Sequence, residues 1–191
     1  MSYPDIVLAS ASPRRRELLA QLGVSFSLIS ADIDETPQHN EAAADYVQRL
    51  ALQKARAGQA MSQTSLPVLG ADTVVVADGE ILGKPADFAE FARTMQLLSG
   101  RCHKVMTAIA LVNAERQLQQ LVTTEVCFRP LNAAEIAAYW HSGEPQDKAG
   151  GYGIQGLAAK FVRRINGSYT AVVGLPLCET EQLLLQWQEQ L

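Results

Sequence analysis

Three adjacent arginines at the start of an expected helix have the clearest chemical potential in this sequence. They occupy positions 14–16, directly after Ser12 and Pro13. Ser12 is a typical N-cap and Pro13 a typical first helical residue, so a helix is expected to begin here and to end at Gly23. A helix start offers unpaired backbone N–H groups and partial positive charge, which favour a bound phosphate. The segment predicts an anion site more readily than a solvated first turn, because arginines there oppose the helix dipole.

Carboxylates form a second group of candidates. Asp72 follows a run of small and apolar residues, where a charged side chain would be costly without a partner or a function. Glu35 lies in an acidic loop with Asp32 and Asp34, and a solvated loop is an equally good interpretation of the latter two. Both segments are expected at strand ends, where α/β sheets bind ligands. Because carboxylates repel phosphate unless a cation lies between them, a divalent metal such as Mg²⁺ is implied.

Isolated lysines beside helix breakers or within apolar patterns form a third group, comprising Lys54, Lys84 and Lys148. Lysine binds phosphate as a point charge. Each of the three, taken singly, is more typical of a solvated surface. Together they are consistent with a clamp for a triphosphate.

Length and charge narrow the class of protein. The 191 residues suit one domain or two small lobes sharing a core, with 48% hydrophobic and 19% charged residues. A net charge of −4 argues against broad electrostatic binding of nucleic acid. No stretch resembles a signal peptide or a membrane span, so we expect a cytoplasmic protein.

The cysteines also favour a cytoplasmic protein. Cys102, Cys127 and Cys178 are odd in number, widely separated and set in apolar runs. We therefore expect buried free thiols in a reducing compartment.

Short apolar runs alternate with amphipathic helical patterns along the chain, which predicts an α/β fold. Glycines at 150, 151, 153 and 156 predict a loop over residues 148–156. The expected strands cover residues 6–9, 26–29, 67–71, 73–77, 80–82, 105–112, 121–128 and 161–165, and the expected helices cover 13–22, 42–60, 87–98, 132–141 and a last segment from 176 onward.

Five segments resemble the Maf family of nucleoside triphosphate pyrophosphatases. They are SASPRRRELL at 10–19, GADTVV at 70–75, LGKP at 82–85, DKAG at 147–150 and GLPL at 174–177. The resemblance spans nearly the whole chain and implies a single domain over residues 1–191. It further implies an elongated α/β fold related to inosine triphosphate pyrophosphatases, with a twisted mixed sheet flanked by helices and two lobes around a central cleft. The implied reaction converts a nucleoside triphosphate to its monophosphate and pyrophosphate with Mg²⁺ or Mn²⁺.

The resemblance also assigns roles to residues. It implies that Asp72 is the proton acceptor and that Arg14, Thr73 and Gln155 occupy the positions that set base preference. This combination resembles the branch acting on dTTP, UTP and modified pyrimidine nucleotides. The alternative is the sister branch that prefers 7-methyl-GTP, which carries Trp, Gln and Glu at those three places.

The expected mechanism is attack of water on the α-phosphorus. Glu35 and Asp72 hold the divalent ion, Asp72 deprotonates the water, and the Gln155 amide reads the edge of the base. Positioning and charge stabilisation dominate such phosphoryl chemistry. The residues expected to bind the remainder of the substrate are Ser10, Ser12, Arg15, Lys54, Lys84 and Lys148.

A nucleotide-sensing regulator of cell division or septum formation is an alternative from another class, which the family resemblance also suggests. A sensor would bind dTTP or UTP without steady release of pyrophosphate. The expected partner is in either case a small nucleotide, with no stable nucleic acid and no membrane. The resemblance also favours a homodimer.

Overall fold

A computed structural model describes residues 3–189 as an alternation of helices and strands. This architecture confirms the predicted α/β class. The strands are β1 (Ile6–Ala9), β2 (Phe26–Ile29), β3 (Val68–Ala77), β4 (Glu80–Leu82), β5 (Cys102–Val112), β6 (Gln117–Phe128) and β7 (Val162–Asn166). The α-helices are α1 (Pro13–Gln21), α2 (Ala43–Met61), α3 (Phe88–Leu98), α4 (Ala133–His141), α5 (Tyr169–Val173) and α6 (Leu177–Glu189), and short 3₁₀ turns are η1 (Glu144–Asp147), η2 (Ala149–Gly151) and η3 (Leu157–Phe161).

The strands form one mixed sheet, as the family resemblance implied. Their order is β2-β1-β3-β5-β6-β7, with β4 paired to β3. Strand β1 pairs in parallel with both β2 and β3, whereas β4 is antiparallel to β3 and β7 is antiparallel to β6. The chain therefore places successive strands on opposite sides of β1, which makes the carboxyl end of β1 a topological switch point.

The chain divides into two compact units. The first comprises the residues up to Asp72, Thr107–Val122 and the residues from Gly174 onward, and the second comprises Thr73–Met106 and Thr123–Val173. Strands β3, β5 and β6 contribute residues to both units. The cleft expected between two lobes stays a prediction, as does the single-domain boundary.

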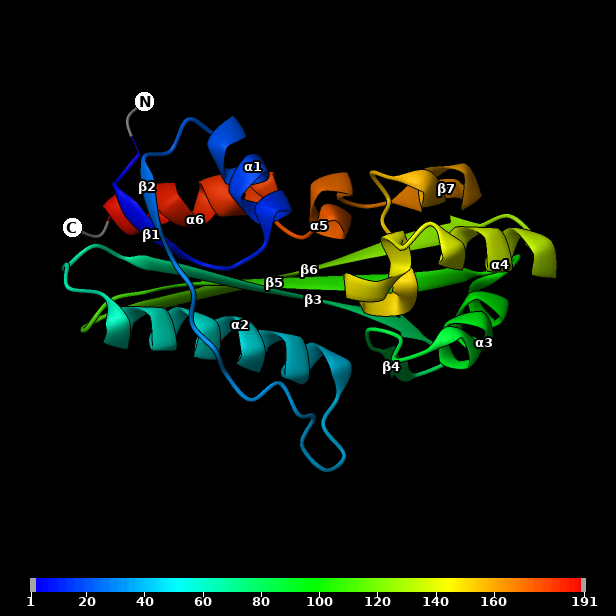
Figure 1. Cartoon of the computed structure of the whole chain (residues 1–191). Helices are drawn as coiled ribbons and strands as arrows, with labels where there is room; N and C mark the ends of the chain where they lie inside the picture. Colours follow the sequence, from blue (N-terminus) through cyan, green and yellow to red (C-terminus); the bar gives the residue numbers. More distant parts are fainter. Residues whose placement is uncertain (1–2, 190–191) are drawn as a thin grey trace. The chain divides into compact units, whose positions relative to one another are not determined.

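In the first unit, helix α2 lies on one face of the strands, and α1 and α6 lie on the other (Figure 1). The apolar stripe of α2 is buried, including Val47, Leu50 and Ala55. Leu184 and Trp187 of α6 are buried as well. Burial of these apolar faces is the main contribution that stabilises the layers.

The second unit has an aromatic core and capped helices. Phe91 of α3 stacks against Tyr139 and Trp140 of α4, with ring centroids 5.9 and 5.1 Å apart. Asn132 and Glu135 form a complete capping box at the start of α4. Such caps satisfy backbone donors that would otherwise lack partners.

Two predictions about elements were wrong. The sequence indicated two strands separated at Asp72, but β3 runs without a break through Val68–Ala77, and Asp72 is therefore inside a strand. The sequence also missed helix α5, which covers only Tyr169–Val173. Asp72 interrupts the apolar run and therefore suggested a strand end. The backbone hydrogen bonds that define a strand do not depend on the side chain, so the strand continues through this position.

The prediction of free buried thiols was wrong for all three cysteines, for two different reasons. Cys102 on β5 and Cys127 on β6 form a disulfide, with their Cα atoms 3.9 Å apart. Neighbouring strands place facing residues this close, although 25 residues separate them in sequence. Cys178 is free but exposed rather than buried. The cysteines therefore no longer support a reducing compartment.

Across residues 3–189, helices that are both long and apolar enough to cross a bilayer are absent.

Candidate active site

Lys54 joins two carboxylates in the first unit. Its ammonium nitrogen lies 2.6 Å from Asp72 Oδ1 and 2.7 Å from Glu35 Oε1. The side chains of Lys54 and Asp72 are only 14% and 10% exposed, whereas that of Glu35 is 49% exposed. The cluster thus has a shielded inner part and an open outer part, and charge-assisted bonds of this length are strong when partly shielded from water.

Close packing of helix α2 on the sheet brings Lys54 to Asp72. A Cβ atom at Gly70 would lie 2.4 Å from the Ala51 carbonyl oxygen and 2.5 Å from the Ala55 nitrogen. Only glycine therefore lets α2 approach β3 so closely. Lys54 lies on the same side of the helix as Ala51, and Asp72 follows Gly70 by two residues on the strand.

Tyr46 fixes the acidic loop against the same helix. Its hydroxyl donates a hydrogen bond to the Glu35 carbonyl oxygen at 2.8 Å. Burial raises the pKa of Tyr46, and the charges of Asp72 and Glu35 raise it further, so the phenol remains a donor. Tyr46 was not among the predicted site residues, although a hydroxyl beside the buried face of α2 was the available signal.

Arg15 shares the electrostatic environment of the cluster. Its Nε donates to the Gly174 carbonyl oxygen at 2.8 Å. Burial lowers the pKa of Arg15, and the negative charge of Asp72 opposes that effect. Two cationic and two anionic side chains, Arg15, Lys54, Glu35 and Asp72, are thus gathered within the first unit.

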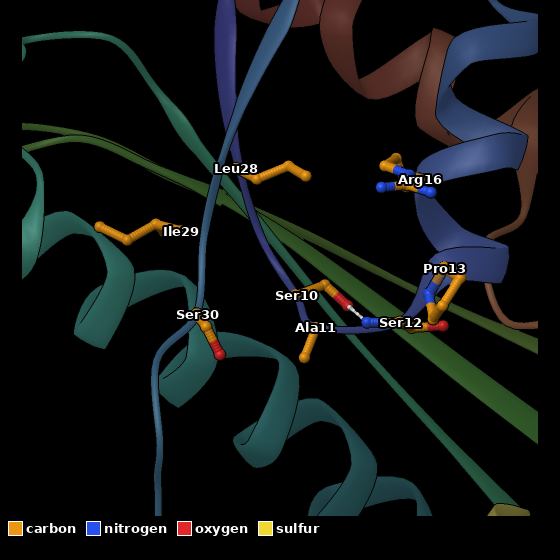
Figure 2. Close-up of a pocket in the computed structure, with 8 residues that line it drawn as sticks. All are labelled: Ser10, Ala11, Ser12, Pro13, Arg16, Leu28, Ile29 and Ser30. Carbon is orange, nitrogen blue, oxygen red and sulfur yellow. Dashed lines mark hydrogen bonds between the residues drawn. The ribbon is translucent and has the colours of Figure 1, made fainter.

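A pocket of about 340 Å³ lies at the start of α1. Figure 2 shows Arg16 on the helix and Leu28 on the strand flanking the loop that carries Ser10 and Ser12. The lining residues are Ser10, Ala11, Ser12, Pro13, Arg16, Leu28, Ile29 and Ser30. The predicted serines thus line a concave surface beside the end of β1.

The backbone amides of this turn are less available than the sequence suggested. Ser12 Oγ accepts from the Arg15 amide at 3.4 Å, and the Ser12 carbonyl accepts from the Arg16 amide at 3.3 Å. Ser10 Oγ in turn accepts from the Ser12 amide at 3.1 Å. The prediction of Ser12 as the N-cap is confirmed, but the same cap occupies donors that were expected to be unpaired.

The second unit holds the other candidates. The Gly150 amide donates to the Gly83 carbonyl at 3.0 Å, which ties the segment of Lys84 to that of Lys148. Lys148 Nζ donates to the Glu144 carbonyl at 2.7 Å and pairs with Asp147 at 2.6 Å, whereas Lys84 is exposed.

The positions expected to set base preference lie in both units. Arg14 and Thr73 are half-buried and Gln155 is exposed. Arg14 belongs to the first unit, and Thr73 and Gln155 to the second. Their joint action on one base, and the convergence of the lysines on one triphosphate, stay predictions.

The similarity of this chain to known proteins extends over almost its whole length. A family model described as Maf-like protein matches residues 5–187. The chain belongs to the Maf-like family. The dTTP/UTP pyrophosphatase of Pseudoalteromonas translucida is 57% identical over 179 residues, covering 94% of this chain and 95% of that relative. The dTTP/UTP pyrophosphatases of Vibrio parahaemolyticus and Escherichia coli O157:H7 are 56% and 58% identical, covering 96% and 94% of this chain and 97% and 91% of the relatives. The resemblance seen in five motifs is confirmed.

Solved structures show a weaker likeness to this Maf-like chain. The Staphylococcus aureus Ham1 protein has a TM-score of 0.45 and 14% identity, covering 65% of this chain and 71% of that one. A nucleoside triphosphatase, a dITP/XTP pyrophosphatase from Mycobacterium abscessus, has a TM-score of 0.42 and 21% identity, covering 68% and 75%. Both scores are too low to support conclusions about this chain.

The carboxylates of this Maf-like protein fit a divalent cation. Glu35 and Asp72 each place an oxygen within 2.7 Å of the same ammonium, so the two already surround one positive charge. Mg²⁺ typically binds one or two carboxylates together with substrate phosphate oxygens. The donor set and the half-exposed position of Glu35 suit such an ion.

A second group of metal-ligating side chains suits a cation less well. Cys102, Glu125 and Cys127 lie close together, but the cysteines are joined in the disulfide. Arg164 Nη2 lies 2.7 Å from Glu125 Oε1, so a guanidinium already neutralises that carboxylate. This group is better explained as a structural link between β5, β6 and β7.

Proposed function

We propose that this protein hydrolyses dTTP, UTP and modified pyrimidine nucleoside triphosphates to the monophosphate and pyrophosphate. The observation that carries the proposal is the pair of carboxylates, Glu35 and Asp72, held around Lys54. Relatives named dTTP/UTP pyrophosphatase, 56% to 58% identical over most of their length, support the substrate class.

In the proposed mechanism, Asp72 accepts a proton from the water that attacks the α-phosphorus. Its largely buried carboxylate is oriented by the bond from Lys54 at 2.6 Å, which leaves the second carboxylate oxygen for water. A base held in fixed geometry is more effective than one that must be ordered during the reaction.

Glu35 and Asp72 would hold the divalent cation, Mg²⁺ or Mn²⁺. When bound, the cation would neutralise charge on the triphosphate and polarise its oxygens. Lys54 would keep its bond to Asp72 and, once the cation takes over Glu35, would direct another N–H to a phosphate oxygen. Arg15 would supply a fixed positive charge, since its guanidinium is anchored on the Gly174 carbonyl.

The remaining assignments belong to the same proposal. Ser10, Ser12, Lys84 and Lys148 bind phosphate oxygens, and Arg14, Thr73 and Gln155 select a pyrimidine over 7-methyl-GTP. The substrate comes from a cytoplasmic nucleotide pool, and the active protein is a homodimer.

A nucleotide panel with pyrophosphate detection tests the function. We expect many turnovers with dTTP, UTP, pseudouridine triphosphate and 5-methyl-pyrimidine triphosphates, and little with 7-methyl-GTP. In H₂¹⁸O, the heavy oxygen should appear on the monophosphate. A preference for 7-methyl-GTP would reject the base assignment, and stoichiometric binding without turnover would favour the sensor. Heavy oxygen solely in pyrophosphate would contradict attack on the α-phosphorus.

A further inference from the structure

We propose that Glu144 is a positioning residue that holds the glycine-rich loop so that Gln155 is presented to the substrate. This inference rests on the proposed function, in which Gln155 reads the base and the nearby Lys148 binds phosphate. Glu144, Lys148 and Gln155 all belong to the second unit.

The Glu144 carboxylate binds both helix α4 and the far end of the loop. Oε1 accepts from the Tyr139 hydroxyl at 2.7 Å, and Oε2 accepts from the Leu157 amide at 2.8 Å. The Glu144 carbonyl oxygen also accepts from Lys148 Nζ at 2.7 Å. Glu144 therefore connects the buried Tyr139 of α4 to both ends of residues 148–157.

The loop is built to fit around these two side chains. A Cβ atom at Gly156 would lie 2.2 Å from Glu144 Oε2, and one at Gly153 would lie 2.7 Å from Lys148 Cε. A larger residue at either position would displace the carboxylate or the lysine. Close approach of the Glu144 and Lys148 side chains therefore accounts for glycine at both positions.

Gln155 lies at the point that this arrangement leaves exposed. The Gly153 amide donates to the Tyr139 hydroxyl at 3.1 Å, and the Gly156 amide donates to the Gly153 carbonyl at 3.0 Å. The residues on either side of Gln155 are therefore fixed, while its own side chain is exposed. A recognition group on a fixed turn loses less conformational entropy on binding than one on a mobile loop.

Electrostatics keep the connection intact near neutral pH. Burial alone would raise the pKa of Glu144, but bonds from the Leu157 amide, the Tyr139 hydroxyl and the Ala158 amide bring it below its usual value. Burial raises the pKa of Tyr139, and its bond to Glu144 raises it further. Acceptor and donor therefore keep their roles together.

Glu144→Gln in the full chain tests the inference. The amide oxygen can keep the bond from the Leu157 amide, but the NH₂ group that replaces the other oxygen cannot accept from the Tyr139 hydroxyl, whose hydrogen loses its acceptor. We expect KM for dTTP to rise about tenfold while kcat changes less than about twofold, as expected for lost substrate binding. Amide hydrogen exchange at residues 153–158 should become faster. Combined with Gln155→Ala, the substitution should raise KM no further than Gln155→Ala alone.

Glu135→Gln is the matched control, because it removes a carboxylate that caps α4 and pairs with Arg129 in the same unit. It should change neither KM nor exchange at 153–158. If Glu144→Gln fails to fold, Tyr139→Phe removes the shared hydroxyl more gently and should give the same pattern.

An unchanged KM despite faster exchange, or additive effects of Glu144→Gln and Gln155→Ala, would overturn the inference. Unchanged exchange would also overturn it. Failure of the wild-type protein to hydrolyse any nucleotide would instead refute the proposed function, while the exchange data would still report on the loop.

Discussion

At the scale of single residues, the proposed reaction depends most on Asp72, the proton acceptor. Asp72→Asn keeps the shape of the side chain but removes its ability to accept a proton. We expect kcat for dTTP to fall about a thousandfold, within the range of general-base contributions. The measurement is steady-state release of pyrophosphate at saturating substrate.

Asp78→Asn is a matched control for that change. Asp78 is exposed, pairs with Arg101 and has a φ of 49°, a conformation that asparagine also tolerates. Activity should remain close to that of the unchanged protein. Near-normal turnover by Asp72→Asn would contradict the assigned role of Asp72.

His103 gives a prediction about acid stability. Burial lowers its pKa to about 4, from the ordinary value of 6.5, and Nε2 lies 2.7 Å from the Tyr152 hydroxyl. The unfolded chain thus binds a proton below pH 6.5 that the folded chain refuses until about pH 4. Stability should therefore be fully present above pH 6.5 and fall by about 3 kcal/mol on acidification to pH 4.

Denaturant titrations between pH 7 and pH 4 measure this effect, with His103→Gln as the comparison. The variant should be less stable at pH 7 but show a shallower decline with acid, because glutamine does not titrate. Equal slopes for both proteins would show that other groups dominate the acid response.

At the scale of elements, the contact between α2 and β3 determines the geometry of the cluster. Gly70→Ala forces a methyl group against the backbone of Ala51 and Ala55. We expect a loss of about 1–3 kcal/mol in unfolding free energy, typical of overpacking. The methyl group would also push α2 away from β3. Lys54 would then lie farther from Asp72, so kcat should fall.

Gly83→Ala is a suitable control, since a Cβ there meets no atom within 4 Å. It should cost little stability. A Gly70→Ala protein of unchanged activity would show that the close approach of α2 is unnecessary for the site.

At the scale of the whole molecule, metal should be required for turnover but not for folding. Lys54 already bridges Glu35 and Asp72 and so reduces their mutual repulsion in the free protein without a metal ion. We expect EDTA to abolish pyrophosphate release while leaving the melting temperature unchanged. Added Mg²⁺ or Mn²⁺ should restore activity. A large drop in melting temperature would indicate a structural metal instead.

Local signals predicted most elements of this fold. Ser12 as N-cap and the glycine-rich loop both depend on residues a few positions apart. The alternation of apolar runs with amphipathic patterns indicated the α/β class for the same reason. The five motifs likewise indicated the family, since each is a contiguous string.

Contacts between distant residues were decided only by the tertiary structure. Three such contacts join separate segments of the chain. They are the ion pairs of Lys54 with Glu35 and Asp72, the disulfide between Cys102 and Cys127, and the hydrogen bond from the Leu157 amide to Glu144. Strand order and the approach of a helix to a sheet set such distances, and both arise from packing of the whole chain rather than from local preference. The sequence was therefore enough to predict which charged residues are candidates for the site, whereas only the tertiary structure showed which of them pair with one another.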